Sequence, residues 1–196
     1  DCITAEEIDK ILKEVDSPTK GMGQLFYNEG VKAGIDPIFA LGFFRSESSF
    51  GKKGLAQKTN SIGNIRYSGS CPGTEYKTDN SGSYCHYADW EQGIKDWYRL
   101  ISGGVYVKGG LDTVEKIIPT YAPSEDNNDE KAYIRNVRSF VEEKRGIKFS
   151  VLIPDQSEGV VADATTTLGD DCLVFGVIGD YGKDDNHERD VAKLVN

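Results

Sequence analysis

The 196-residue sequence lacks the features that mark several classes of protein. It contains no run of about eighteen apolar residues, so we expect no segment that spans a membrane. Lys and Arg number 23 against 32 Asp and Glu, which gives a net charge of −9 and leaves no basic excess for a nucleic-acid partner. None of the four cysteines forms a Cys-x-x-Cys pair, so the sequence predicts neither a zinc site nor a cofactor.

An initiator methionine is also missing. The chain begins Asp1-Cys2 and has Met22 as its one methionine, so we expect a processed product or a fragment whose signal peptide has been removed. Residues 1–149 hold 20 basic and 22 acidic residues, a net of −2, whereas residues 150–196 hold 3 and 10, a net of −7. We therefore expect one domain over residues 1–149 followed by an acidic appendage.

Hydrophobic spacing predicts a mainly helical chain with one small β excursion. Thr4 and Glu7 form a capping-box pattern before a helix that places Ile8, Ile11 and Leu12 on one face. Further helices are expected over residues 23–33, 37–49, 89–101, 111–118 and 128–143. The predicted fold class is α+β, with a helical lobe, a small β-hairpin lobe and a cleft between them.

A buried helix is expected to begin after Asp36. Asp36 is a favoured N-cap, Pro37 is a favoured first helical residue, and Gly51 is expected to end the helix. Apolar residues lie on all sides of this helix, which is typical of a helix inside a core. Its last turn nevertheless carries one carboxylate, Glu47.

The position of Glu47 predicts an unusual carboxyl group. Phe43 and Phe44 lie four and three residues earlier, so their rings share its face and remove it from water. Burial and the negative end of the helix dipole should both raise its pKa, while Arg45 points to a different face. A carboxylic acid kept protonated near neutral pH can donate a proton to a glycosidic oxygen.

Four segments resemble, in order, the bacterial N-acetylglucosaminidase family that cuts peptidoglycan (mannosyl-glycoprotein endo-β-N-acetylglucosaminidase-like). They are Glu47–Gly51 with the basic stretch to Ala56, the loop Asn60–Arg66, the aromatic segment Tyr87–Ile94, and Thr120–Pro123 followed by Tyr133. The matches cover residues from about 35 to 140. The resemblance implies a lysozyme-like fold, Glu47 as catalytic acid and Tyr121 near the cleaved sugar.

The same resemblance implies a set of residues around the substrate. We expect the glycan to contact Asn60, Ser61, Asn64, Tyr87, Trp90 and Tyr133. Trp97 lies on the aromatic stripe of the same predicted helix as Trp90 and is expected to pack in the core. The expected partner is the peptidoglycan glycan strand, and the protein is expected to be a monomer that is secreted or held at the cell surface or cell wall.

Two cysteines bracket a predicted hairpin. Residues 75–78 and 83–87 have the pattern of two strands around Asp79-Asn80-Ser81-Gly82, with Cys71 and Cys85 at its base. A bridge between them would close a loop of about 15 residues and stabilise the domain by roughly 3 kcal/mol. Such a bridge indicates an oxidising compartment. Cys2 and Cys172 could form a second pair, which the sequence alone does not decide.

The second catalytic group is less clearly marked than Glu47. Glu75 and Asp79 on the predicted hairpin would face Glu47 across the cleft, and either could be the second carboxylate. Asp89 is better explained as the N-cap of the helix that follows it. A neighbouring-group mechanism through the N-acetyl group of the substrate is the alternative that needs no second acid.

The composition changes beyond residue 149. Residues 150–172 are rich in Asp, Ser, Thr and Gly and are predicted to be a linker. Residues 173–196 contain an apolar strand and a Gly179-Asp180 turn that resemble the start of a calcineurin-like metallophosphoesterase. In that family the residue matching Asp180 ligates a metal, but the later ligand motifs are absent, so Asp180 would bind metal only in a complete domain. We expect a partial second domain here.

The sequence also allows two other hypotheses about function. One is a muramidase or a lytic transglycosylase on the same fold, because both use a Glu at a helix end. The other is a non-catalytic glycan-binding or structural module, in which Glu47 forms an ordinary ion pair with Lys52 or Lys53.

Overall fold

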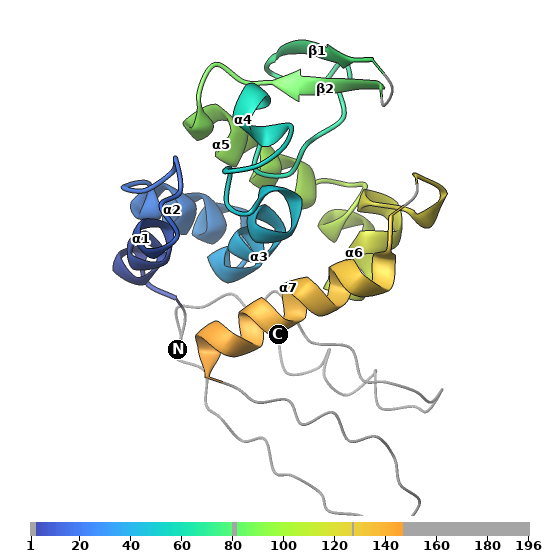
Figure 1. The fold of residues 1–196 in the computed structure, drawn as a ribbon. Coiled ribbons are helices and arrows are strands. Elements are labelled where there is room, and N and C mark those ends of the chain that lie inside the picture. Colours follow the sequence, from blue (N-terminus) through green and yellow to red (C-terminus); the bar gives the residue numbers. More distant parts are fainter. Residues whose placement is uncertain (1–2, 80–81, 127, 147–196) are drawn as a thin grey trace, which may run out of the picture.

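The computed structural model describes residues 3–79, 82–126 and 128–146. Within these ranges the chain is α+β and mainly helical, with one two-stranded antiparallel sheet, as predicted. Figure 1 shows the hairpin at one end of the molecule, beside helices α4 and α5, and helix α7 at the opposite end. The predicted linker over 150–172, the segment over 173–196 with Asp180, and both Cys2 and Cys172 lie outside the described residues.

The first two helices form the N-terminal edge of the helical lobe. Helix α1 spans Ala5–Glu14 and helix α2 spans Gly23–Ala33. The predicted capping box is present, because the Thr4 hydroxyl accepts from the Glu7 amide at 3.2 Å and the Glu7 carboxylate accepts from the Thr4 amide at 2.8 Å. The predicted apolar face of α1 is buried against the core.

Helix α3 spans Pro37–Ser48 and lies at the centre of the core. The Asp36 carboxylate caps it by accepting from the Ile38 amide at 3.0 Å, and also accepts from Arg145 of α7. Every residue from Pro37 to Phe44 is buried. The helix ends at Ser48, before the predicted stop at Gly51, because the chain already turns to left-handed backbone at Ser49 with φ of 51°.

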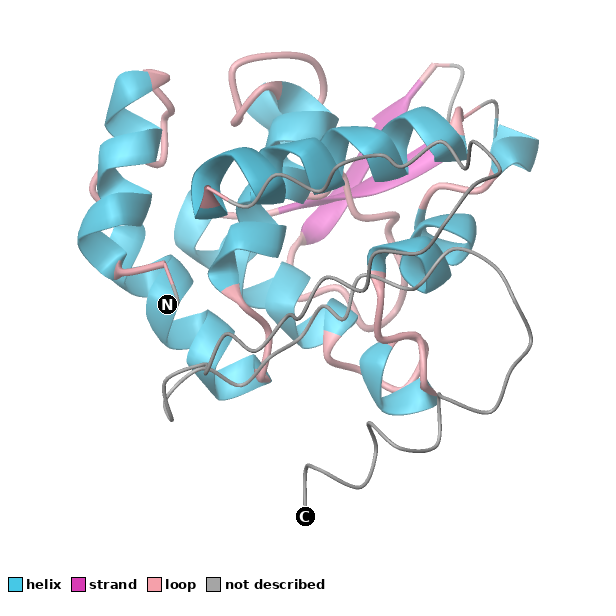
Figure 2. Cartoon of the chain, turned by 90° about the horizontal axis from the view of Figure 1, so that it is seen from below, coloured by secondary structure: helices cyan, strands magenta, loops and turns pink. Residues whose placement is uncertain are grey.

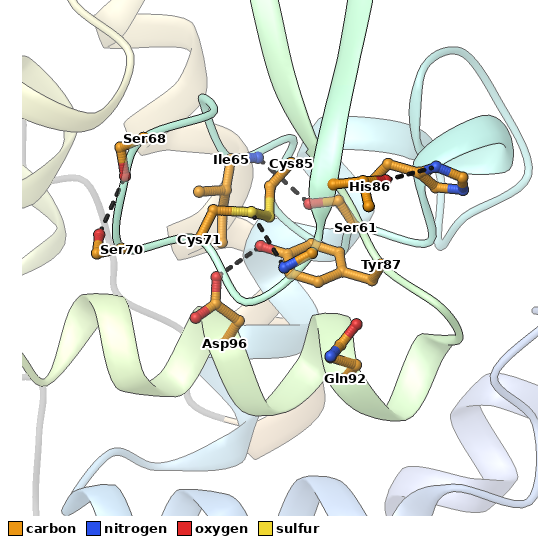
Figure 3. The surroundings of a disulfide bond; sticks show 12 residues. Ser61, Ile65, Ser68, Ser70, Cys71, Cys85, His86, Tyr87, Gln92 and Asp96 are labelled. Carbon is orange, nitrogen blue, oxygen red and sulfur yellow. Dashed lines mark hydrogen bonds between the residues drawn. A yellow bond between two sulfur atoms is a disulfide. The ribbon is translucent and has the colours of Figure 1, made fainter.

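The β lobe follows helix α3. It contains the short helix α4 (Ala56–Thr59) and the hairpin of β1 (Thr74–Thr78) and β2 (Gly82–His86), in which Glu75 lies opposite Cys85. A disulfide between Cys71 and Cys85 ties the segment before β1 to β2 (Figure 3). Both the hairpin and this disulfide confirm the sequence prediction.

The remaining helices close the core. They are α5 (Trp90–Ile101), the short 3₁₀ turn η1 (Val107–Gly109), α6 (Val114–Tyr121), the 3₁₀ turn η2 (Ser124–Asp126) and α7 (Glu130–Arg145). Asp89 caps α5 by accepting from the Gln92 amide at 2.8 Å, as predicted. Helix α6 begins after its own cap, Thr113, so it lies about one turn later than the predicted 111–118.

The core is one continuous cluster to which all the longer helices contribute. Helix α7 packs along α3, and in Figure 2, which views the molecule from below, the two-stranded sheet lies behind the helices. Trp97 is fully buried, as predicted for a core residue. No helix in the described ranges combines the length and apolarity that crossing a membrane requires.

Candidate active site

A cleft of about 1090 Å³ opens between the hairpin and the helical lobe. Its helical wall includes Glu47, the end of α5 and the end of α6, and its other wall is the hairpin with the loop from Gly63 to Arg66. Four of the residues predicted to be catalytic or to contact substrate line it: Glu47, Asn64, Asp79 and Tyr121. Residues far apart in the sequence therefore meet around one open space, as the predicted two-lobed architecture requires.

Glu47 lies in the last turn of α3, partly buried, with both carboxylate oxygens held. The Tyr133 hydroxyl on α7 donates to Oε1 at 2.6 Å, and the Asn64 side-chain amide donates to Oε2 at 2.8 Å. Arg45 is exposed and lies over the Phe140 ring, 5.5 Å from its centroid. Within the described residues no lysine pairs with Glu47, so the alternative of an ordinary ion pair with Lys52 or Lys53 finds no support.

The pKa of Glu47 is raised from 4.5 to about 6. Burial is the main cause, since removing a carboxylate from water penalises its charged form. The hydrogen bonds from Tyr133 and Asn64 act in the opposite direction, because both donors favour the charged form. The upward direction agrees with the prediction made from the neighbouring Phe43 and Phe44. Near pH 6 the group therefore occupies both protonation states in comparable amounts.

An aromatic cluster supplies the dry surroundings of Glu47. The Phe43 ring meets the rings of Tyr121, Trp97 and Tyr133 at centroid distances of 5.2, 5.3 and 5.6 Å. Burial and the nearby charge of Glu47 raise the pKa values of Tyr121 and Tyr133 well above the ordinary tyrosine range. Both hydroxyls therefore remain protonated and keep their proton to donate in hydrogen bonds.

Tyr121 bonds to the loop that carries Asn64 and makes no direct hydrogen bond to Glu47 among the described residues. Its hydroxyl donates to the carbonyl oxygen of Gly63 at 2.5 Å, one residue before Asn64. A Cβ atom at Gly63 would lie 2.1 Å from the Tyr121 hydroxyl and 2.5 Å from Trp97, so only glycine fits there. The contact between α6 and this loop thus fixes the backbone that carries Asn64 to Glu47.

Asn64 is held in a backbone conformation that few residues adopt. Its φ is 45°, in the left-handed region that asparagine tolerates better than most side chains. Its Nδ2 group donates to Glu47, while its Oδ1 atom is buried and has no hydrogen-bond partner among the described residues. An amide can donate to a charged carboxylate and, after a half-turn about χ2, accept from a protonated one. Asn64 can therefore hold Glu47 in either protonation state.

The two predicted hairpin acids occupy different positions. Asp79 is exposed and lines the cleft. Glu75 is outside the cleft lining, where it accepts from the Ser83 hydroxyl at 2.7 Å and pairs with Lys77 at 3.6 Å. Of the two candidates for a second carboxylate, only Asp79 therefore faces the same space as Glu47.

Two further carboxylates of the cleft were missed by sequence reasoning. Asp96 is buried and already bound, because it accepts from the Tyr87 hydroxyl at 2.7 Å and from Arg99 at 2.5 Å. Asp126 is exposed and pairs with Arg66 at 3.5 Å. No local pattern could have found the second pair, since its members are 60 residues apart.

Five residues predicted to bind the glycan lie outside the cleft lining. One is Tyr133, which bonds to Glu47, and the other four bond or pack within the protein. Asn60 donates to the Tyr87 carbonyl at 3.1 Å, and the buried Ser61 hydroxyl accepts from the Ile65 amide at 3.2 Å. Figure 3 shows the Ser61 contact and the bond from the Tyr87 hydroxyl to Asp96 beside the disulfide. Trp90 packs on Phe44 with ring centroids 5.6 Å apart. These four side chains build the frame of the site, and we do not include them among the proposed substrate contacts.

Comparisons with known proteins found no match that bears on function. No protein-family model matches the chain, and no curated protein matches it. Among the described residues, no cluster of three or more His, Cys, Asp or Glu side chains is arranged to hold a metal ion.

The hydrogen bond from Tyr133 yields a first prediction. Tyr133→Phe removes one of the two donors that favour the charged carboxylate, so the pKa of Glu47 should rise by about one unit above 6. Titration of the Glu47 carboxyl carbon by NMR measures this directly. Tyr98→Phe is the matched control, because it removes a buried hydroxyl that has no hydrogen-bond partner among the described residues and should shift the titration much less. An unchanged midpoint in Tyr133→Phe would contradict the assigned hydrogen bond.

Proposed function

We propose that the protein is a glycoside hydrolase that cuts β-1,4 bonds of bacterial peptidoglycan, as an endo-β-N-acetylglucosaminidase, with Glu47 as its general acid. The observation that carries the proposal is a single carboxyl group whose pKa is raised to about 6, held by two donors on the wall of an open cleft. A structural acid needs neither the raised pKa nor the open cleft. Raised carboxyl pKa values in clefts are typical of catalytic acids.

The proposed chemistry follows from this geometry. Protonated Glu47 donates its proton to the glycosidic oxygen, which leaves as a hydroxyl while positive charge develops on the sugar ring. The resulting carboxylate is then stabilised by the same two donors, Tyr133 and Asn64. Tyr121 positions the Gly63 carbonyl behind Asn64 and supports the loop during this change of charge.

We propose Asp79 as the second carboxylate, because it lines the cleft and Glu75 does not. Inverting enzymes hold their two carboxyl groups about 6.5 to 9.5 Å apart to admit a water molecule, and retaining enzymes about 5 to 5.5 Å. Participation of the substrate N-acetyl group is the alternative if Asp79 proves dispensable.

The wider expectations belong to the same proposal. We propose a lysozyme-like fold for the described residues, on the strength of a helix-end acid facing a small β lobe across a cleft. The disulfide between Cys71 and Cys85 supports action in an oxidising compartment, as a secreted or cell-surface protein. We also propose that the protein acts on an extended glycan strand as a monomer.

Mass spectrometry of digested peptidoglycan tests the proposal. New reducing ends on N-acetylglucosamine are the expected result. Reducing ends on N-acetylmuramic acid would replace the proposed activity with a muramidase, and anhydro ends with a lytic transglycosylase. If the purified protein binds peptidoglycan without releasing any fragment, the protein is a glycan-binding module and the catalytic proposal fails.

A further inference from the structure

The hairpin wall of the cleft carries two tyrosines that the proposed acid chemistry does not use. Tyr76 in β1 and Tyr84 in β2 are direct partners in the strand register, and both line the cleft. Side chains of directly opposed residues leave a sheet on the same face, with Cβ atoms about 5 Å apart. The two side chains therefore leave the hairpin on the same face, the one that meets the cleft, and we refer to Tyr76 and Tyr84 as the tyrosine platform.

The rest of the protein leaves much of this platform unused. Both side chains are only partly buried, and neither hydroxyl has a hydrogen-bond partner among the described residues. The guanidinium of Arg66 lies 4.7 Å from the Tyr84 ring centroid, and the His86 ring lies 6.2 Å from that of Tyr76. These contacts hold the rings in place while their hydroxyls stay free to bond.

A surface of this kind matches the chemistry of a sugar ring. A pyranose has an apolar face of C–H groups and a rim of hydroxyls, so an aromatic face with a free phenol hydroxyl can bury the first and bond the second. The cleft volume of about 1090 Å³ exceeds the usual range for a drug-sized ligand, which leaves room for more than one sugar. The hairpin and Glu47 thus occupy different parts of one continuous space.

We propose that the tyrosine platform is a sugar-binding subsite, on which one ring of the glycan strand stacks while Glu47 acts on a bond elsewhere in the same strand. This inference rests on the proposed function, because it takes the glycan as the occupant of the cleft. It adds that contact with the β lobe makes binding depend on the length of the glycan strand. Long strands reach both Glu47 and the platform, whereas a disaccharide fills only one of the two positions.

The test compares two ligands in an inactive background. In Glu47→Gln protein, Tyr84→Leu should weaken binding of a peptidoglycan-derived hexasaccharide roughly tenfold, because the aromatic face is lost while an apolar side chain remains. Binding of the corresponding disaccharide should change little. Tyr84→Phe, which keeps the ring, should retain most of the affinity. Calorimetry measures the affinity of each variant for each ligand. Tyr67→Leu is the matched control, since Tyr67 is 40% exposed but outside the cleft lining.

The outcomes separate this inference from the proposed function. If Tyr84→Leu binds the hexasaccharide as tightly as its parent, the subsite is wrong, while the release of peptidoglycan fragments by the wild-type protein would still uphold the proposed function. If the Glu47→Gln parent does not bind the hexasaccharide and the wild-type protein releases no peptidoglycan fragments, both proposals fall. Tyr76→Leu, on the opposite strand, repeats the measurement if Tyr84→Leu fails to give the circular dichroism spectrum of the parent.

Discussion

Glu47→Gln is expected to lower kcat on peptidoglycan by roughly 10² to 10⁴-fold, the usual contribution of a general acid. The glutamine side chain has nearly the same shape and can still accept from Asn64 or Tyr133, but it has no acidic proton for the glycosidic oxygen. Release of reducing ends from purified peptidoglycan provides the measurement. Binding of glycan should be kept, which separates lost chemistry from a lost fold. Activity within about threefold of the wild type would exclude Glu47 as the acid.

The same substitution should leave a signature in stability. Because the pKa of Glu47 is about 6 in the folded protein and 4.5 without the fold, the folded state binds more protons between these values. The free energy of unfolding therefore falls as pH rises through this range, and the loss is complete about one pH unit above the folded-state pKa. A shift of this size corresponds to about 2 kcal/mol. Glu47→Gln should thus be more stable than the wild type at pH 7 but not at pH 4.

Urea unfolding at the two pH values measures this difference. Glu75→Gln is the matched control, because it makes the same chemical change at an exposed hairpin acid outside the cleft. A loss of activity without a gain in stability at pH 7 would mean that the burial of Glu47 does not raise its pKa. The two readouts therefore test the acid role and its physical cause separately.

Local signals explain which parts of the fold could be predicted from the sequence. The caps at Thr4, Asp36 and Asp89 act within four residues of their partners, so their patterns are visible in the chain itself. The hairpin and its disulfide follow from two short strands around a polar turn. Glu47 stood out for the same reason, because its two aromatic neighbours lie on the same helix.

Long-range contacts explain what the sequence did not reveal. Tyr133 bonds to Glu47 across 86 residues, and only its resemblance to a family segment suggested any role. The same resemblance pointed to Tyr87 and Trp90, yet those side chains face the core. A motif names residues that occur together, but not which of them face the cleft and which support it. Tyr76 and Tyr84 lie directly opposite each other on the two strands of the hairpin. This local pattern is the signal that could have identified the face of the hairpin that meets the cleft.

The loop that carries Asn64 depends on a single glycine, and Gly63→Ala is expected to disrupt it. The added methyl group would lie 2.1 Å from the Tyr121 hydroxyl and 2.5 Å from Trp97, both far inside normal contact distance. Neither ring can retreat easily, because both pack against Phe43. Overpacking of this kind costs about 1 to 3 kcal/mol of unfolding free energy. Displacement of the loop also withdraws Asn64 from Glu47. Peptidoglycan digestion should therefore fall by more than the loss of folded protein accounts for.

Denaturant unfolding and peptidoglycan digestion of the same samples check both effects. Gly69→Ala is the matched control, since a Cβ atom there meets nothing within 4 Å. Adding Tyr121→Phe to Gly63→Ala removes the hydroxyl involved in the closest collision, so the double variant should regain part of the stability. It should not regain full activity, because the bond that fixes the Gly63 carbonyl is gone as well. Independent, additive effects of the two substitutions would show that the Tyr121 contact does not set the position of the loop, and the support proposed for Glu47 from α6 would then have to be abandoned.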